Sequence, residues 1–260
     1  MSLITYHRWG NGPEVLIAFH GIGQSHQVYQ SWAEQLGTLY TLYAFDLPYH
    51  GANARTSSEA FSKAEWQAQF NDFLDDQSIE NFSIVGFSMG GRFALATLEG
   101  FAARIRHVFL LAPDGIRENP YYRLAVHNPL SRLIFKYTVF HVSWLMKLAE
   151  WLGKVKLIHP STMRFALWML DSPEKRTRVY HSWIAFRHLR FSQASLVNLL
   201  NQHAIPVQFF MGTFDRMMPP PLVSPLCKQV PTASRVVLRC GHNHLIQHTA
   251  EYLQRKKLQA

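Results

Sequence analysis

Short apolar runs that end at a glycine or a polar residue recur along this chain, and they constrain its fold more than any other feature. The runs are continuous rather than alternating, which is typical of strands that are covered on both faces of a sheet. Helical patterns fill the intervals between most of them. The runs predict strands over residues 15–19, 40–45, 82–85, 107–111, 205–211 and 235–238.

Helices are predicted over residues 26–37, 62–77, 89–103, 220–229 and 245–257. This alternation of strands and helices predicts an α/β fold with a mostly parallel central sheet flanked by helices. One further strand is predicted near Leu3 to Trp9. We expect it to pair with the strand that begins at Val15, because Gly10-Asn11-Gly12 supplies turn residues that tolerate positive φ.

The alternation stops at Gly115 and resumes near Ile205. The chain between them predicts several helices and no clear strand, and Ser172-Pro173 is typical of a helix start with serine as its cap. A large helical insertion between two strands is typical of a lid or cap. We therefore expect a core domain of residues 1–116 and 204–260 with an inserted helical cap of residues 117–203.

The stretch Gly86-Phe87-Ser88-Met89-Gly90-Gly91 follows a predicted strand and opens a predicted helix. In that setting the pattern is typical of a nucleophile elbow, a strained turn that projects the serine hydroxyl above the sheet. Gly86 and Gly90 leave room where side chains would clash. We expect Ser88 to be a nucleophile, the other interpretation being a glycine-rich packing turn.

A serine hydroxyl needs a base, and the base needs a carboxylate that orients it. Asp215 and His242 each follow a late strand, so both are expected at the same sheet edge as Ser88. The order Ser, Asp, His along the chain is the order that elbow-type triads use. Asp114 stays open as an alternative acid and His244 as an alternative base.

The C-terminal histidines His242, His244 and His248 permit a second interpretation, a metal site. A triad already explains His242. We therefore expect no metal.

The loop His20-Gly21-Ile22-Gly23 at the end of an earlier strand is the second feature that suits acyl chemistry. The backbone N–H groups of Ile22 and Met89 are expected to form an oxyanion hole. The alternative is an ordinary strand-to-helix loop. His20 itself is expected to form structural hydrogen bonds, and it joins Phe87 and Arg92 as a candidate substrate contact.

Together these motifs resemble the α/β-hydrolase superfamily over the whole chain outside residues 117–200. The matching residues are His20 to Gly23, Asp46-Leu47-Pro48-Tyr49-His50-Gly51, Gly86 to Gly91, Gly212 to Asp215 with Pro219, and Gly241-His242. The resemblance implies the α/β-hydrolase fold, a cap at the insertion and a cofactor-free esterase, thioesterase, peptidase or related activity. The family usually has glycine where Tyr49 stands. Asp46 and His50 are expected to build a loop near the mouth of the site.

Arg92 follows the elbow as the end of a Gly-Gly-Arg sequence. Similar endings occur in menaquinone-pathway lyases that resemble these hydrolases, where the arginine meets a substrate carboxylate. The other interpretation places Arg92 on the exposed surface of its helix. Both stay open.

The net charge of +9 is confined to one stretch of the chain. Residues 117–200 contain 13 Lys or Arg and four Asp or Glu, whereas the remainder is balanced. The stretch lies within a sequence that carries catalytic motifs, so we expect no nucleic-acid partner.

Aromatic and basic side chains are interleaved in the expected cap, among them Phe135, Tyr137, Phe140, Trp144, Trp151, Trp168, Trp183, Lys136, Lys147, Lys154, Arg187 and Arg190. Leu130, Leu133, Ile134 and Tyr137 contribute to one long apolar face there. One interpretation is that the aromatic residues pack and the basic residues face water. The other is a substrate with an apolar chain and an anionic part, or weak contact with an anionic membrane surface.

The N-terminus has no basic stretch followed by a long apolar run, and no segment reaches the ~18 apolar residues of a membrane span. Cys227 and Cys240 are expected to be free thiols in the cytoplasm.

The function expected from the sequence is hydrolysis of a carboxylic ester or thioester through an acyl-enzyme, with apolar acyl groups among the substrates. The alternatives are a lyase that uses the same triad on a carboxylate-bearing substrate and a non-catalytic binding protein.

Overall fold

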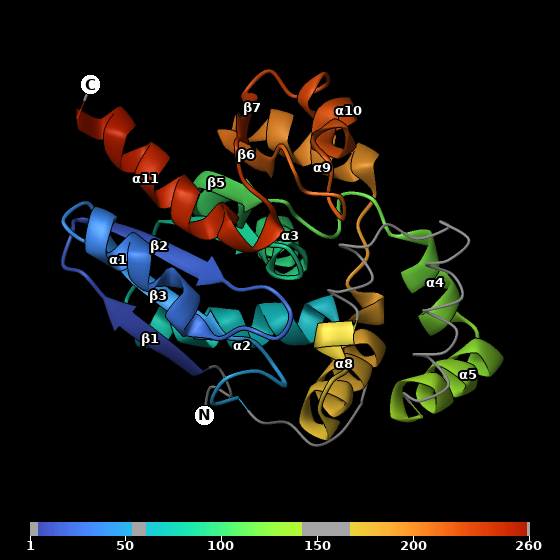
Figure 1. Cartoon of the computed structure of the whole chain (residues 1–260). Helices are drawn as coiled ribbons and strands as arrows, with labels where there is room; N and C mark the ends of the chain where they lie inside the picture. The colour runs from blue at the N-terminus through green and yellow to red at the C-terminus, as the bar shows by residue number, and fades with distance from the viewer. Residues whose placement is uncertain (1–4, 54–60, 142–166, 259–260) are drawn as a thin grey trace. The chain divides into compact units, whose positions relative to one another are not determined.

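The computed structural model describes residues 5–53, 61–141 and 167–258 (Figure 1). These residues form a seven-stranded sheet with the strand order β1-β3-β2-β4-β5-β6-β7. Every neighbouring pair is parallel except β1 with β3. The strands are β1 (Thr5–Trp9), β2 (Glu14–Phe19), β3 (Tyr40–Asp46), β4 (Phe82–Phe87), β5 (Ile105–Leu111), β6 (Val207–Gly212) and β7 (Ala233–Leu238). The predicted mostly parallel sheet is confirmed.

The predicted pairing of the first two strands is wrong. Strand β1 pairs antiparallel with β3, and Thr5 lies opposite Asp46. Both edges of β2 are occupied, by β3 on one side and β4 on the other, so the free edge of β3 is the one open to β1. The glycine turn still has a role, because Gly10 has a φ of 73° and the amides of Asn11 and Gly12 donate to the carbonyl of Gly37.

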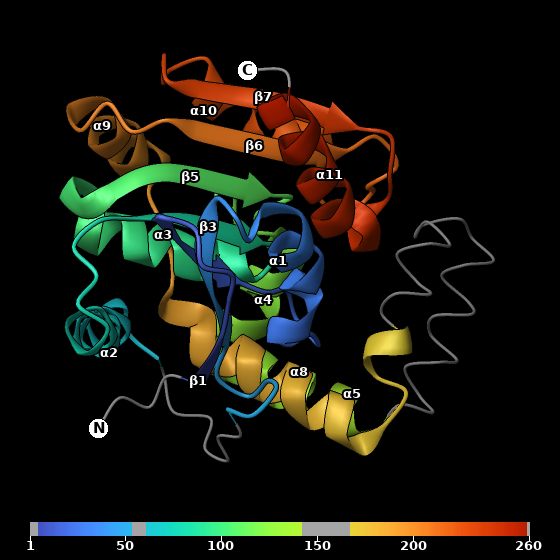
Figure 2. The same ribbon diagram turned by 90° about the vertical axis from the view of Figure 1, so that its left-hand side faces the viewer.

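Helices cover both faces of the sheet, as Figure 2 shows. Helices α1 (Gln30–Leu36) and α11 (Leu245–Leu258) lie on one face, and α2 (Lys63–Asp76) and α3 (Gly90–Phe101) lie on the other. Short 3₁₀ turns extend or connect the helices at η1 (His26–Tyr29), η2 (Ala102–Arg104) and η5 (His242–His244). The predicted helix over 220–229 is split into η4 (Pro220–Val223) and α10 (Ser224–Cys227).

Alternate residues of the strands build the two halves of the core. On the α1 and α11 face, the strand residues pack with helix side chains such as Trp32 and Ile246. On the opposite face, Trp66 of α2 packs edge-on against Phe93 of α3, with ring centroids 4.9 Å apart. The indole of Trp66 donates to Thr97 Oγ1 at 2.9 Å, so this large side chain is buried without an orphaned donor. The continuous apolar runs of the strands follow from burial on both faces.

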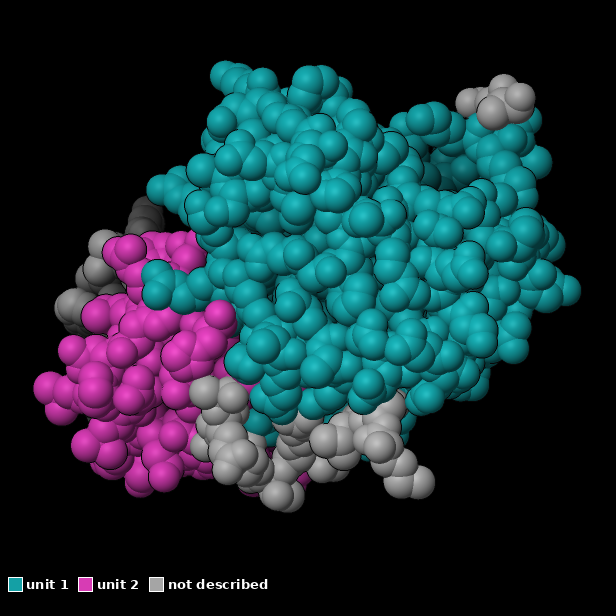
Figure 3. Space-filling model, turned by 180° about the vertical axis from the view of Figure 1, so that it is seen from behind, with its two compact units in different colours: residues 1–54, 62–117, 189–260 teal, residues 55–61, 118–188 magenta. Residues whose placement is uncertain are grey.

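The chain divides into two compact units, coloured separately in Figure 3. Among the described residues, the first unit comprises 5–53, 62–117 and 189–258, and it contains the whole sheet. Helix α9 (Gln193–Gln202) belongs to this unit, where the Asn201 side chain donates to the carbonyl of Gln229. The expected insertion ended at residue 203, whereas the second unit ends at residue 188.

The second unit contains α4 (Pro120–His127), α5 (Pro129–Phe140), α8 (Pro173–Ala185) and the turn η3 (Phe186–His188). Phe61 joins it, donating its amide to the carbonyl of Ala185. Ser172 caps α8 by accepting from the amide of Lys175, and Pro173 is the first helical residue, as predicted.

A small aromatic core holds these helices together. Phe135 of α5 stacks on Trp183 of α8 at 5.1 Å, and the Tyr122 hydroxyl donates to the carbonyl of Trp183 at 3.0 Å. These aromatic residues of the expected cap therefore pack with one another. Trp144, Trp151, Lys147 and Lys154, which were part of the same prediction, lie outside the described residues. Within the described ranges, no helix is both long enough and apolar enough to cross a membrane.

Candidate active site

Ser88 occupies the turn between β4 and α3 in a left-handed backbone conformation, with a φ of 50°. Its amide donates to the carbonyl of Leu111 at 2.9 Å. Its own carbonyl accepts from the amides of Gly91 at 2.8 Å and Asp114 at 2.9 Å. A positive φ is strained for serine, so these three backbone hydrogen bonds hold a conformation that an isolated turn would not keep.

Two glycines make this turn possible because other backbone approaches them closely. A Cβ atom on Gly90 would lie 2.0 Å from the carbonyl oxygen of Phe19. On Gly86 it would lie 2.8 Å from both the Cβ of Ala94 and the carbonyl oxygen of Gly90. The steric role that the sequence suggested for both glycines is therefore present in the structure.

The imidazole of His242 lies within hydrogen-bonding distance of both other predicted groups. His242 Nε2 is 3.1 Å from Ser88 Oγ, and His242 Nδ1 is 2.6 Å from Asp215 Oδ2. The side chain of Asp215 is fully buried and that of His242 is 10% exposed. The ring of Phe87 lies beside the imidazole, with centroids 4.8 Å apart. This arrangement can transfer a proton from the hydroxyl to the ring while the carboxylate fixes the ring's orientation.

Asp215 is held by backbone groups of its own loop. Its Oδ1 accepts from the amides of Met217 and Met218, each at 2.9 Å, so Oδ2 is left to face the imidazole. The preceding turn is fixed by parallel pairing of β6 and β7, in which Gly212 lies opposite Leu238. That register brings the ends of two consecutive strands together and thereby places Asp215 near His242.

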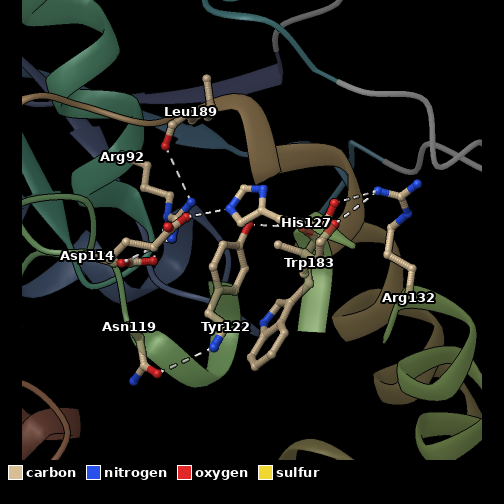
Figure 4. Close-up of polar contacts among 10 residues, drawn as sticks. Arg92, Asp114, Asn119, Tyr122, His127, Arg132, Trp183 and Leu189 are labelled. Carbon is tan, nitrogen blue, oxygen red and sulfur yellow. Dashed lines mark hydrogen bonds and ion pairs between the residues drawn. The ribbon is translucent and has the colours of Figure 1, made fainter. Parts of the chain in front are cut away.

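The alternative acid, Asp114, has a different partner. Its carboxylate binds the guanidinium of Arg92, with Oδ2 2.6 Å from Nε and Oδ1 3.3 Å from Nη2 (Figure 4). Nη1 of Arg92 donates to the carbonyl of Leu189 at 3.4 Å. Arg92 is only 2% exposed, so the interpretation that it lies on the helix surface is wrong. The physical reason is that the carboxylate at the end of β5 neutralises it inside the fold.

The remaining histidines of the C-terminal segment lie apart from this arrangement. His244 is exposed at the end of η5, and Nδ1 of His248 pairs with Glu251 Oε2 at 3.4 Å. Across residues 5–53, 61–141 and 167–258, no three His, Cys, Asp or Glu side chains are grouped so that they could hold a metal ion.

The proposed oxyanion donors come from two different turns of the first unit. Met89 precedes the first residue of α3, and Ile22 follows the end of β2. Among the described residues, neither backbone amide donates to an acceptor. Gly21 lies close to Phe87, since a Cβ atom on Gly21 would be 2.9 Å from Cδ1 of that ring. An oxyanion hole needs such uncommitted N–H groups, and their role stays a prediction.

A family model described as alpha/beta hydrolase fold matches residues 14–249. The chain belongs to the α/β-hydrolase fold family.

Several relatives are similar to this α/β-hydrolase chain at low identity. An uncharacterized protein of Mycobacterium tuberculosis (strain ATCC 25618 / H37Rv) is 26% identical over 224 residues, which are 81% of this chain and 64% of that protein. The chain thus spans less than two thirds of that relative. A pimeloyl-[acyl-carrier protein] methyl ester esterase of Legionella pneumophila (strain Corby) is 23% identical over 258 residues, 95% of this chain and 94% of the esterase.

Solved structures share the fold. A thermophilic esterase from Thermogutta terrifontis superimposes with a TM-score of 0.70 at 16% identity, covering 98% of this chain and 92% of that one. A meta-cleavage product hydrolase gives a TM-score of 0.66 at 20% identity, covering 99% and 95%. At these identities the likeness concerns the fold alone.

His20, which was a candidate substrate contact, is fully buried. Its Nε2 accepts from the amide of Leu47 at 3.1 Å, so Nδ1 is the protonated nitrogen and donates to the carbonyl of Gly21 at 2.7 Å. The ring thereby joins the ends of β2 and β3. These contacts agree with the structural hydrogen bonds that were expected of His20.

The loop after β3 is organised by Asp46. Burial alone would raise the pKa of Asp46, but hydrogen bonds from the amides of Ala52 and His26 and from the His26 ring outweigh it and lower that pKa below its ordinary value. Gly51 has a φ of 54°, and a Cβ there would lie 2.2 Å from the carboxylate. Tyr49 has a φ of 70°, which accounts for the glycine that this family usually has at that position.

Both cysteines are free, with Cys240 buried and Cys227 half-buried. Burial raises the pKa of Cys240, and the neighbouring charge of Asp215 raises it further. Cys240 therefore stays a neutral thiol that packs beside the site.

Sequence reasoning missed two features of the site. One is the pairing of Arg92 with Asp114, and the other is the pair of amides from Met217 and Met218. The sequence did contain a signal for the ion pair. Arg92 and Asp114 each follow one of two neighbouring strands, and residues in such positions can meet at one edge of the sheet. The two amides that donate to Asp215 are positioned by backbone geometry, which no particular residue type in the sequence reveals.

Proposed function

We propose that this chain is a serine hydrolase that cleaves a carboxylic ester or thioester. The observation that carries the proposal is the continuous chain of hydrogen bonds from Ser88 Oγ through the two nitrogens of His242 to Asp215. A carboxylate, an imidazole and a hydroxyl in this order are the parts of a nucleophilic triad.

The reaction begins when His242 Nε2 takes the hydroxyl proton and Ser88 Oγ attacks the substrate carbonyl carbon. The carbonyl oxygen becomes an oxyanion, which the amides of Ile22 and Met89 stabilise. His242 then gives its proton to the departing alkoxide or thiolate, and the acyl group stays on Ser88. A water molecule that His242 deprotonates attacks this ester and releases the acid, restoring the hydroxyl. Throughout, Asp215 fixes the tautomer and stabilises the imidazolium.

Ester hydrolysis is favoured over lyase chemistry by the surroundings of Arg92. A lyase that holds a substrate carboxylate with Arg92 would need a guanidinium that is open to the ligand. Here the guanidinium is buried and binds Asp114 and the carbonyl of Leu189. The curated methyl ester esterase relative points to ester chemistry as well. We include apolar acyl groups among the substrates.

Hydrolysis of p-nitrophenyl acetate, butyrate and octanoate tests the proposal. Wild-type protein should release p-nitrophenol steadily, and the Ser88→Ala variant should lose about 10⁴-fold or more in kcat while unfolding at the wild-type temperature. Rates that rise with acyl length would support an apolar acyl site. Wild-type turnover in the Ser88→Ala variant would overturn the assignment.

A further inference from the structure

Helix α5 carries a stripe of large apolar side chains on its outer face. Leu130, Leu133, Ile134 and Tyr137 are 66%, 64%, 57% and 59% exposed. Their spacing of three, four and seven residues puts them on one side of the helix. We call these four residues the α5 stripe. Exposed apolar side chains scattered singly are ordinary, but a contiguous stripe on one helix marks an interaction surface.

The fold of the second unit does not require the α5 stripe. The inner face of the same helix supplies the packing, because Val139 is buried and Phe135 stacks on Trp183. The neighbouring helix α4 adds Leu124, which is 70% exposed. Helix α5 is therefore apolar on two opposite faces, of which one builds the core of its unit and the other is exposed.

The charged Lys, Arg, Asp and Glu residues within α4 and α5 are all basic. Residues 119–141 include Arg123, Arg132 and Lys136 and contain no Asp or Glu. Arg123 and Lys136 are exposed, whereas Arg132 donates to the carbonyls of Val126 and His127. The described part of the second unit has seven Lys or Arg and three Asp or Glu.

The apolar stripe and the basic residues beside it together indicate what kind of partner this face binds. A second copy of the chain would bring two basic faces together, and like charges across an interface oppose association. An anionic lipid surface matches both the exposed apolar side chains and the basic charge beside them. Leucine, isoleucine and tyrosine side chains enter the boundary between headgroups and acyl chains, while flanking Lys and Arg meet the lipid phosphates.

We propose that the α5 stripe, with Arg123 and Lys136, docks the protein on an anionic lipid surface. The helix lies in the plane of the interface and does not span the bilayer. The proposal goes beyond ester hydrolysis and does not depend on it, since binding to the lipid surface needs no reaction at Ser88.

Co-sedimentation with vesicles tests this inference. Wild-type protein should bind phosphatidylcholine vesicles that contain one quarter phosphatidylglycerol more tightly than pure phosphatidylcholine vesicles, and added salt should weaken the binding. Leu133→Glu should reduce the partition coefficient on the anionic vesicles roughly tenfold. Lys136→Glu should reduce it roughly fivefold or more.

Leu258→Glu is the matched control, because Leu258 is 81% exposed at the end of α11 and lies in the other unit. This variant should bind like the wild type. So should Ser88→Ala, which separates lipid docking from catalysis. Equal partition of wild type and Leu133→Glu, or equal binding to both kinds of vesicle, would overturn the inference. A dimer by light scattering that Leu133→Glu converts to a monomer would overturn it too, by assigning the α5 stripe to a second copy.

Discussion

The guanidinium of Arg92 binds both carboxylate oxygens of Asp114, and the backbone amide of the same Asp114 donates to the carbonyl oxygen of Ser88. The ion pair thus connects the first turn of α3 to the loop after β5, and that loop holds the strained backbone of Ser88. Arg92 is buried, so its charge needs the carboxylate of Asp114 beside it. We regard the ion pair as a structural support of the fold around Ser88, because Ser88 is held by the backbone amide of Asp114 and not by its side chain.

Asp114→Asn should lower the free energy of unfolding by about 3 kcal/mol, because it removes the counter-charge of a buried guanidinium. Urea unfolding followed by circular dichroism measures the change. The matched control is Asp171→Asn, which removes an exposed i,i+4 pair with Lys175. That variant should cost less than about 1 kcal/mol. Equal losses in the two variants would contradict a structural role for the buried pair.

Asp215→Asn should lower kcat by about 10⁴-fold with little change in KM, because the neutral amide no longer holds the imidazole in the tautomer that accepts the serine proton. Asp114→Asn should retain most of the wild-type kcat after correction for the folded fraction. Steady-state kinetics on p-nitrophenyl butyrate at a temperature where both variants are folded compares the two carboxylates. A larger kcat loss in Asp114→Asn than in Asp215→Asn would make Asp114 the triad acid.

Gly90→Ala should destabilise the protein by about 3 kcal/mol and abolish ester hydrolysis, because its new methyl group would overlap the carbonyl oxygen of Phe19. Gly241→Ala is the control. Apart from its two chain neighbours, none of the described residues has an atom within 4 Å of a Cβ at Gly241, and its φ of −90° suits any residue. Thermal unfolding should therefore separate the two variants, with Gly241→Ala close to the wild type. A Gly90→Ala variant of wild-type stability would contradict the packing of the elbow described above.

The lowered pKa of Asp46 predicts a pH dependence of stability. A carboxylate whose pKa is lower in the folded than in the unfolded chain stabilises the fold fully above its unfolded pKa, and this contribution is lost as pH falls through the folded pKa. The ordinary value is 3.8. Asp46→Asn should thus be less stable than the wild type at neutral pH, and the difference should shrink as pH falls below that value. A difference that stays constant over this range would contradict the assignment.

Much of the fold could be predicted from the sequence because its determinants are local. Continuous apolar runs marked β2 to β7, and turn residues at their ends marked where Ser88, Asp215 and His242 would lie. The partner of β1 could not be predicted in the same way. Pairing depends on which sheet edge stays free, and that is decided by the order of all the strands.

The surroundings of the site were less predictable than its residues. Arg92 lies in a buried stretch of α3, and the counter-charge that its burial requires comes from Asp114, 22 positions later in the chain. Tyr49 shows the same limit, since a positive φ at a tyrosine contradicts local preference and is imposed by the loop around Asp46. The α5 stripe was part of a predicted apolar face, but its exposure depends on which side of the helix packs against α8.

In the proposed reaction, Ser88 carries the acyl group. Rapid mixing with p-nitrophenyl butyrate, acid quenching and peptide mass spectrometry would locate that group directly. We expect a butyryl adduct on the peptide that contains Ser88, formed with a burst of p-nitrophenol and absent from Ser88→Ala. Steady turnover with the acyl group on another residue, or undiminished turnover in Ser88→Ala, would contradict it.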